Sequence, residues 1–301
     1  MELNKKAPYL ISYASSVGGA RLGSAEGPLI LQQSSYANAL KNDGIDLHWH
    51  AVIKSPPGAG ASKSQLVREQ CEALAKSIYH VARDKKFFIV LGGDHSSAIG
   101  TWSGVAEALG AEKQFGLIWI DAHLDSHTPQ TSHTGNIHGM PLASLLGQGD
   151  PAFTQIRLPQ AKLRPENVCL IGARSFEPEE EKLLKDLQVK IFYMDEVERR
   201  GLKAVFKEAI KIVTHHTAGF GLSLDIDSID PTEAPGTGVM EPGGLSASDL
   251  CSVLTTLAAD ARLIGAEIVE FDPHLDKDKI TEKLIFQLMR AITIGESKDK
   301  T

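Results

Sequence analysis

Short apolar runs of strand length recur along this chain, and amphipathic segments of helix length lie between them. This alternation is typical of a parallel β-sheet that is covered by helices on both faces. We predict strands over residues 9–13, 47–53, 87–91, 117–120, 168–171, 191–193, 220–224 and 266–269. The pattern therefore predicts an α/β fold, a single three-layer αβα domain over residues 1–301 with a broad, mostly parallel sheet of about eight strands.

Apolar residues at helical spacing predict helices over 65–82, 204–213, 250–257 and 280–294. Two stretches have the composition of long loops: 15–27, which is rich in glycine and serine, and 126–139, which is rich in threonine, histidine and glycine. Ligands of open α/β sheets bind at the carboxyl ends of the strands, where such loops emerge. We therefore expect the functional site at that edge of the sheet.

Composition narrows the class of partner. The chain has 38 acidic and 31 basic residues, a formal charge of −7, and no long basic run, which disfavours nucleic acid. No stretch approaches the roughly 20 apolar residues of a membrane span, so we expect no membrane partner. Cys71, Cys169 and Cys251 lack paired spacing and are predicted to be buried free thiols. The protein is expected to be cytoplasmic.

The segment Asp121-Ala122-His123-Leu124-Asp125 directly follows the apolar run 117–120. In an extended strand, residues 121, 123 and 125 would face the same side and could converge on one point. Two carboxylates and one imidazole suit Mn²⁺, Fe²⁺, Co²⁺ or Ni²⁺, and suit Zn²⁺ less exclusively than thiolates would. These three residues are candidate metal ligands.

A second acidic segment follows the apolar run 220–224. Asp225 and Asp227 would again face one side, whereas Asp230, next to Pro231, fits a turn. Either segment alone could merely cap a helix or a turn. Together their carboxylates would repel one another, and one or two divalent cations would relieve that repulsion.

His95 follows the strand 87–91 and the glycine pair Gly92-Gly93, which permits a tight turn. Beside two acidic clusters, metal ligation is the better interpretation of this histidine. Its neighbour Asp94 could orient it as a supporting group.

The segments Gly92 to Ser96, Asp121 to Asp125 and Ser223 to Pro231, in this order, resemble the motifs of the ureohydrolase family. This family comprises arginase, agmatinase and related dinuclear manganese enzymes. The resemblance implies two Mn²⁺ per subunit. It implies that His95, Asp121, Asp125 and Asp225 hold one ion, that Asp121, His123, Asp225 and Asp227 hold the other, and that Asp121 and Asp225 bridge them.

The resemblance is closest to arginases, because the loop Thr134 to Pro141 is similar to their Ser-Gly-Asn-Leu-His-Gly-x-Pro loop. It implies hydrolysis of L-arginine to L-ornithine and urea by a metal-bridging hydroxide. Asp125 would aim the hydroxide, Glu270 would pair with the guanidinium nitrogens, and His138 would carry a proton to the departing amine. Family members generally form homotrimers or homohexamers, and this chain is expected to do so.

The far end of the substrate is less defined by the resemblance. Arginases usually have asparagine where this chain has His127, and aspartate where it has Glu177. Val239 also departs from their pattern. The implied substrate-binding residues are His127, Thr134, Asn136, Glu177 and Glu270. A small guanidino substrate is expected, with agmatine, guanidinobutyrate or formiminoglutamate as alternatives to arginine.

Two other classes of function are possible. Asp225-Ile226-Asp227 could be the Asp-x-Asp of a nucleotide-sugar transferase, but that interpretation leaves His95 and the segment 121–125 unexplained. A metal-binding protein without catalytic activity would not need the complete set of ligands and the acid that accompanies them. Hydrolysis of a guanidino compound explains all of these residues.

Overall fold

The computed structural model describes residues 7–54 and 60–294 of the chain. Its centre is an eight-stranded sheet in the order β2-β1-β3-β8-β7-β4-β5-β6, in which every neighbouring pair is parallel. The strands are β1 (Tyr9–Ala14), β2 (His48–Lys54), β3 (Phe88–Gly92), β4 (Gly116–Ile120), β5 (Val168–Ala173), β6 (Lys190–Tyr193), β7 (Phe220–Asp225) and β8 (Leu263–Val269). The predicted α/β class and eight-stranded sheet are confirmed.

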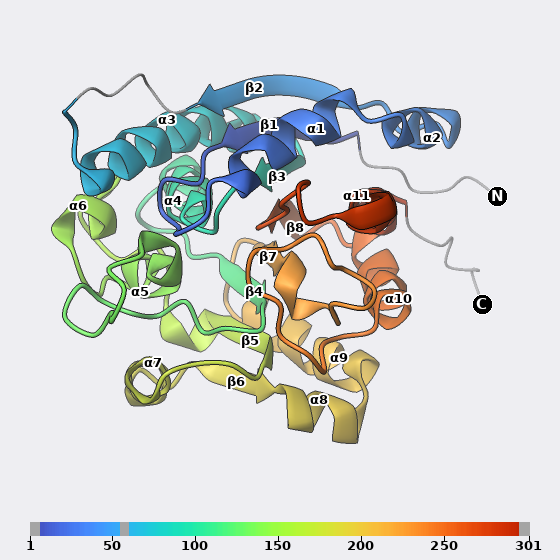
Figure 1. The fold of residues 1–301 in the computed structure, drawn as a ribbon. Helices are drawn as coiled ribbons and strands as arrows, with labels where there is room; N and C mark the ends of the chain where they lie inside the picture. The colour runs from blue at the N-terminus through green and yellow to red at the C-terminus, as the bar shows by residue number, and fades with distance from the viewer. Residues whose placement is uncertain (1–6, 55–59, 295–301) are drawn as a thin grey trace.

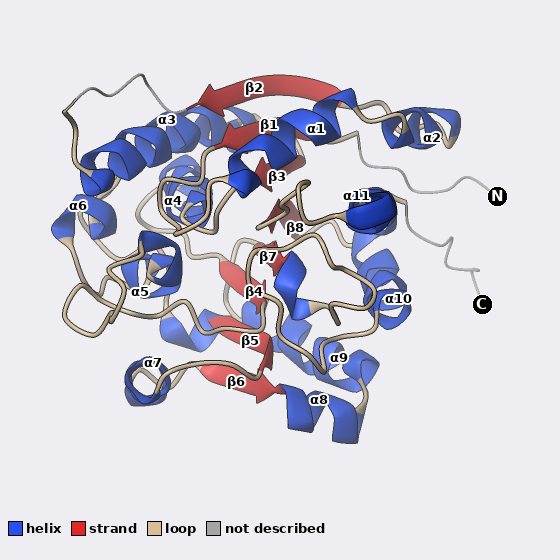
Figure 2. Ribbon diagram, viewed as in Figure 1, coloured by secondary structure: helices blue, strands red, loops and turns tan. Residues whose placement is uncertain are grey.

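Helices cover both faces of this sheet (Figures 1 and 2). One face packs against α3 (Lys63–Arg83), α4 (Ser97–Leu109), α5 (Pro141–Leu145) and α7 (Pro178–Asp186), with α6 (Pro151–Thr154) beside α3. The other packs against α1 (Gly27–Gln33), α2 (Tyr36–Asn42), α8 (Met194–Arg200), α9 (Leu202–Val213), α10 (Ala247–Ala258) and α11 (Ile280–Thr293). Successive residues of β3 alternate between these two cores, as the pleat of a strand requires. Burial on both faces explains the nearly continuous apolar runs.

The predicted strand and helix boundaries lie within three residues of the observed ones. One of the largest differences is at the start of β8, which begins at Leu263 and not at residue 266. Gly265 interrupts the apolar run there, and the ring of Phe88 fills the space beside it: a Cβ on Gly265 would lie 2.3 Å from Phe88 Cζ. Close packing against a neighbouring strand, which no local pattern records, makes glycine suitable inside this strand.

The sheet order places β3, β8, β7 and β4 side by side, so their carboxyl ends open on the same edge. At this edge Gly93 joins three segments: its N–H donates to Tyr13 O (2.8 Å), and its carbonyl accepts the N–H of Glu270 (2.8 Å). A Cβ on Gly93 would lie 1.9 Å from Ser15 O. Only glycine allows the backbones to approach this closely.

Cys71 and Cys169 are buried free thiols, as predicted, whereas Cys251 is only half-buried, because it lies on the partly exposed side of α10. Within the described ranges, no helix has both the length and the apolar character needed to cross a membrane.

Candidate metal centre and adjoining cavity

The segment after β4 brings its three side chains together by a bent loop. The expectation of an extended strand over residues 121–125 is wrong, because β4 ends at Ile120 and the backbone bends at Ala122 and His123. Asp125 then adopts a left-handed conformation with φ of 47°. This conformation is uncommon for a residue other than glycine, and it turns the carboxylate of Asp125 back toward the cluster.

The segment after β7 also leaves the extended conformation. Asp225 is the last residue of β7, and Asp227 lies in the 3₁₀ helix Ile226–Ser228. The side chain of Asp225 accepts a hydrogen bond from the N–H of Asp227 (2.9 Å). A local turn, rather than alternation along a strand, therefore places these two carboxylates.

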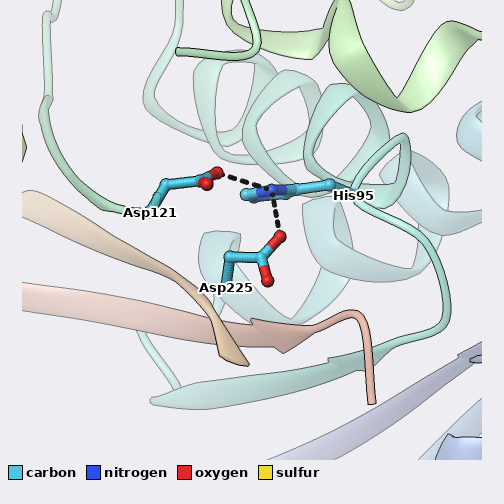
Figure 3. A group of neighbouring side chains, drawn as sticks. All are labelled: His95, Asp121 and Asp225. Carbon is cyan, nitrogen blue, oxygen red and sulfur yellow. Dashed lines mark ion pairs between the residues drawn. The ribbon is translucent and has the colours of Figure 1, made fainter. Parts of the chain in front are cut away.

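His95 lies between β3 and α4, and its Nδ1 faces three carboxylates. Oδ2 atoms of Asp121, Asp125 and Asp225 lie 3.2, 3.0 and 3.1 Å from this nitrogen. Figure 3 shows Asp121 and Asp225 converging on the ring of His95 from separate segments. None of these oxygens meets the geometry of a hydrogen bond to the buried Nδ1. The donor atoms thus surround a common point, as ligands of a cation do.

A second group forms around His123. Its Nδ1 lies 3.1 Å from Asp227 Oδ2 and 3.4 Å from Asp121 Oδ1. The other carboxylate oxygen of Asp121, Oδ2, faces His95, so Asp121 belongs both to the group around His95 and to the group around His123. The indole N–H of Trp119 donates to Asp121 Oδ2 (2.9 Å), which holds this shared carboxylate in place.

The electrostatics of the two groups favour bound cations. Burial raises the pKa of Asp225, and the charges of Asp227 and Asp121 raise it further. Burial and the charge of Asp121 raise the pKa of Asp125 to about 6. Four buried carboxylates in contact are costly when ionised together, and divalent cations would remove that cost.

The donor set fits two first-row divalent ions. His95, Asp121, Asp125 and Asp225 could hold one, and Asp121, His123, Asp225 and Asp227 could hold the other. The mixture of imidazole and carboxylate ligands suits manganese, and a carboxylate whose two oxygens face different histidines suits a bridging position.

His138 and Glu270 form a pair at the side of this cluster. His138 Nδ1 lies 3.0 Å from Glu270 Oε1, which also accepts the N–H of His95 (2.8 Å). Burial alone would lower the pKa of His138, but Glu270 outweighs it and raises that pKa to about 9. The imidazole can therefore hold a proton at neutral pH and deliver it to a leaving group.

Asp94 does not orient the ring of His95. Its Oδ2 accepts the N–H groups of Gly18 (2.7 Å) and Gly19 (3.2 Å), and its Oδ1 accepts the N–H of Ser96 (3.0 Å). The suggested supporting role toward His95 is wrong, because the carboxylate turns toward the loop that follows β1.

A cavity of about 440 Å³ extends from the candidate metal ligands toward solvent. His123, Asp125, Asp225 and Asp227 lie at its inner end, and His138 and Glu270 lie along its wall. It is further lined by His127, Thr134, Asn136, Gly139, Ser175, Phe176, Glu177, Glu180, Thr237, Val239 and Glu241. All of the predicted substrate-binding residues border this one cavity, together with every predicted metal ligand except His95 and Asp121.

Both ring nitrogens of His127 already have partners. Nδ1 lies 3.1 Å from Thr131 Oγ1, and Nε2 lies 3.1 Å from Glu177 Oε2 and 3.5 Å from Glu180 Oε2. Burial and its contact with Glu177 raise the pKa of Glu180 to about 8. His127 is thus engaged by the carboxylates of the cavity wall.

Sequence reasoning missed several polar residues at this site. Glu180 and Glu241 line the cavity, and Ser223 contacts His95. Glu267, a fully buried carboxylate of β8, contacts Ser223. The sequence does contain one indication of this contact, because Glu267 is the one charged residue in the otherwise apolar strand β8.

The sequence and the fold of this chain are similar to those of known arginases. The family model described as "Arginase family" matches residues 9–295. The arginase of Bacillus caldovelox is 43% identical over 226 residues, which are 75% of each chain. The crystal structure of arginase from Bacillus subtilis has a TM-score of 0.89 at 34% identity, covering 98% of this chain and 100% of that one. Arginase of Entamoeba histolytica, solved in complex with L-ornithine, has a TM-score of 0.87 at 29% identity, covering 96% and 99%.

Proposed function

Since this chain belongs to the arginase family, we propose that it hydrolyses L-arginine to L-ornithine and urea with two manganese ions. The chain is an enzyme of the class that hydrolyses carbon–nitrogen bonds in linear amidines. The observation that carries the finer proposal is a single cavity that has four of the six candidate metal ligands at its inner end and the His138–Glu270 pair on its wall.

The two ions would supply a water molecule of lowered pKa near neutral pH, together with electrostatic stabilisation of developing negative charge. The residues of the chain would supply the remaining functions. The carboxylate of Glu270 lies beside the cluster and can pair with a planar guanidinium, which fixes the orientation of the reacting carbon. Asp125, whose pKa is raised, can accept a hydrogen bond from the attacking water and direct it.

Departure of the amine requires a proton. His138 lies in the 3₁₀ helix Ile137–Gly139 at the cavity wall, where its contact with Glu270 raises its pKa and favours the protonated imidazole. A protonated imidazole in hydrogen-bond contact with the carboxylate that holds the guanidinium is placed to protonate the leaving nitrogen.

The outer part of the cavity supports a substrate tail that carries an ammonium group. Glu177 and Glu241 contribute carboxylates there, and no lysine or arginine is among the described lining residues. An α-ammonium group, as in arginine, would be attracted to these carboxylates. A tail that carries only a carboxylate, as in guanidinobutyrate, would be repelled.

The proposal is tested by measuring urea release from arginine, agmatine and guanidinobutyrate, and formamide release from formiminoglutamate, after manganese loading. We expect arginine to give the highest kcat/KM. Faster turnover of another compound would overturn the arginine assignment, and no release from any of them would overturn the hydrolase itself.

A variant tests the shared ligand. Asp121→Asn should lose both ions and activity, because Asp121 belongs to both donor groups. Asp230→Asn is the matched control, since Asp230 lies in the second acidic segment but bonds to Thr232, Gly243 and Gly244 outside the cluster. Metal analysis and turnover are the measurements. Two bound ions with normal turnover in Asp121→Asn would contradict the assignment.

We further propose that the enzyme acts in the cytoplasm as a homotrimer or homohexamer. The support is the family resemblance, together with three free cysteines. Sedimentation equilibrium of the purified protein would determine the number of subunits.

A further inference from the structure

A carboxylate lies inside the protein core behind the candidate metal centre. Glu267 is in the middle of β8 and has no exposed surface. Burial raises its pKa, which reflects the cost of keeping a carboxylate away from water. Its Oε1 accepts hydrogen bonds from the indole N–H of Trp102 (2.6 Å) and from the hydroxyl of Ser223 (2.7 Å). A costly group that is retained among apolar neighbours calls for a role beyond packing.

The sheet itself aligns this group with the metal centre. Glu267 on β8 pairs in register with Ser223 on β7, and Ser223 pairs with Trp119 on β4. Residues paired in register on neighbouring strands point to the same face. The ring of His95 stacks on Trp119, with centroids 4.2 Å apart and an interplanar angle of 14°. One row across three strands therefore supports the ring of His95.

The hydrogen bonds in this row have a defined direction. Ser223 donates its hydroxyl hydrogen to Glu267, so its oxygen is left to accept. His95 Nε2 lies 2.9 Å from that oxygen and must therefore be the donor. When Nε2 keeps its hydrogen, Nδ1 is the nitrogen whose lone pair is available, and Nδ1 is the atom that faces the carboxylates of Asp121 and Asp225.

We propose that Glu267 is a positioning residue for the metal ligand His95 and acts through the hydroxyl of Ser223. The contact sets the tautomer and orientation of the imidazole and increases the basicity of Nδ1 toward a divalent ion. Glu267 itself touches neither the substrate cavity nor the ions. This inference rests on the metal centre proposed above, and it adds a determinant of metal affinity that lies in the core.

A purely structural role is the alternative, because Glu267 also accepts from Trp102 of α4 and lies 3.5 Å from Ser97 Oγ. A structural role would affect stability without a specific effect on one metal site. Ser223 separates the two explanations, since its hydroxyl joins Glu267 to His95. Ser97 contacts the other carboxylate oxygen of Glu267, Oε2, and provides the matched control.

The experiment is calorimetric titration of Mn²⁺ into the metal-stripped full-length protein. Glu267→Gln and Ser223→Ala should each weaken one binding step by about 10- to 100-fold. The double variant should bind Mn²⁺ with about the same affinity as the single variant of lower affinity, because both changes interrupt the same chain of hydrogen bonds from Glu267 through Ser223 to His95. Ser97→Ala should stay within about threefold of the original protein. Thermal unfolding by circular dichroism establishes that each variant is folded.

Several results would overturn the inference. One is a folded Ser223→Ala protein that binds both ions with unchanged affinity. Another is a loss that is equal at both steps, or that adds fully in the double variant. If Glu267→Gln does not fold, Ser223→Ala still decides, because it leaves the carboxylate and its bond to Trp102 in place. Absence of Mn²⁺ binding by the original protein would instead overturn the proposed metal centre, and this inference with it.

Discussion

Two acidic residues of the site have left-handed backbone conformations, which are unusual for their residue type. Asp125 has φ of 47° and Glu270 has φ of 65°. Such conformations cost energy and persist when neighbouring contacts define them. The N–H of Leu142 donates to Asp125 O (3.0 Å), and the N–H of Glu270 donates to Gly93 O (2.8 Å). The loops thus hold both side chains at the cavity, where a relaxed backbone would direct them elsewhere.

Glu270 makes the largest contribution to the raised pKa of His138, and the charges of Asp94 and Asp125 add to it. In the metal-free protein we expect the pKa of His138 near 9, and we expect Glu270→Gln to lower that pKa, because the carboxylate that opposes the effect of burial most strongly is then removed. Imidazole NMR titration measures both values. An unchanged pKa in the variant would contradict the pairing.

The same pair makes stability depend on pH with a defined sign. The folded-state pKa of His138 is raised above the value of about 6.5 in the unfolded chain. Its stabilising contribution is therefore complete below about pH 6.5 and is lost as the pH rises through 9. Glu270→Gln should remove this part of the pH dependence of unfolding.

At the scale of elements, the loop that follows β1 connects the β3–α4 turn to the segment that carries His138. Asp94 holds this loop through the N–H groups of Gly18 and Gly19. The carbonyl of Gly18 in turn accepts the N–H groups of Ile137 (2.8 Å) and His138 (3.2 Å). Asp94 therefore acts on the position of His138 across three segments.

Asp94→Ala should lower kcat by about 10- to 100-fold while both ions remain bound, because a displacement of about 1 Å in a catalytic group has effects of this size. The unpaired N–H groups should also cost about 1–3 kcal/mol of unfolding free energy. Steady-state kinetics, metal analysis and urea unfolding are the measurements. Asp94→Asn, which keeps one acceptor oxygen, should be affected less; a normal kcat in Asp94→Ala would exclude the coupling.

At the scale of the whole molecule, folding concentrates negative charge. Residues at the ends of β4 and β7 place four carboxylates together beneath the cavity, and the end of β3 adds His95 to this buried cluster. Bound cations would compensate this unfavourable arrangement, so metal binding and folding would be thermodynamically linked.

Manganese should raise the melting temperature. At 100 times the dissociation constant, one site contributes about 2.7 kcal/mol, which for a chain of this length corresponds to a rise of about 4 °C. Differential scanning calorimetry with and without chelator measures the change, and an equal concentration of magnesium controls for ionic strength. Equal melting temperatures with and without manganese would contradict a site formed by these residues.

Local sequence was sufficient for the α/β class, for most element boundaries and for the location of chemistry at strand ends. Apolar runs of strand length mark buried parallel strands, and acids such as Asp121 and Asp225 directly follow two of them. The resemblance of three motifs to those of the ureohydrolase family indicated the family. These inferences depend on composition and periodicity over a few residues, which a sequence displays directly.

Tertiary structure decided the contacts. The order of the strands brings His95 beside Asp225, which is 130 positions away, and in-register pairing places Glu267 behind Ser223. Left-handed and turn conformations, rather than the expected extended strand, aim Asp125 at the cluster. Engagement of His127 Nε2 likewise depends on Glu177, which is 50 positions away in the sequence. Strand order and loop conformation follow from packing of the whole chain, and for that physical reason no local pattern could determine them.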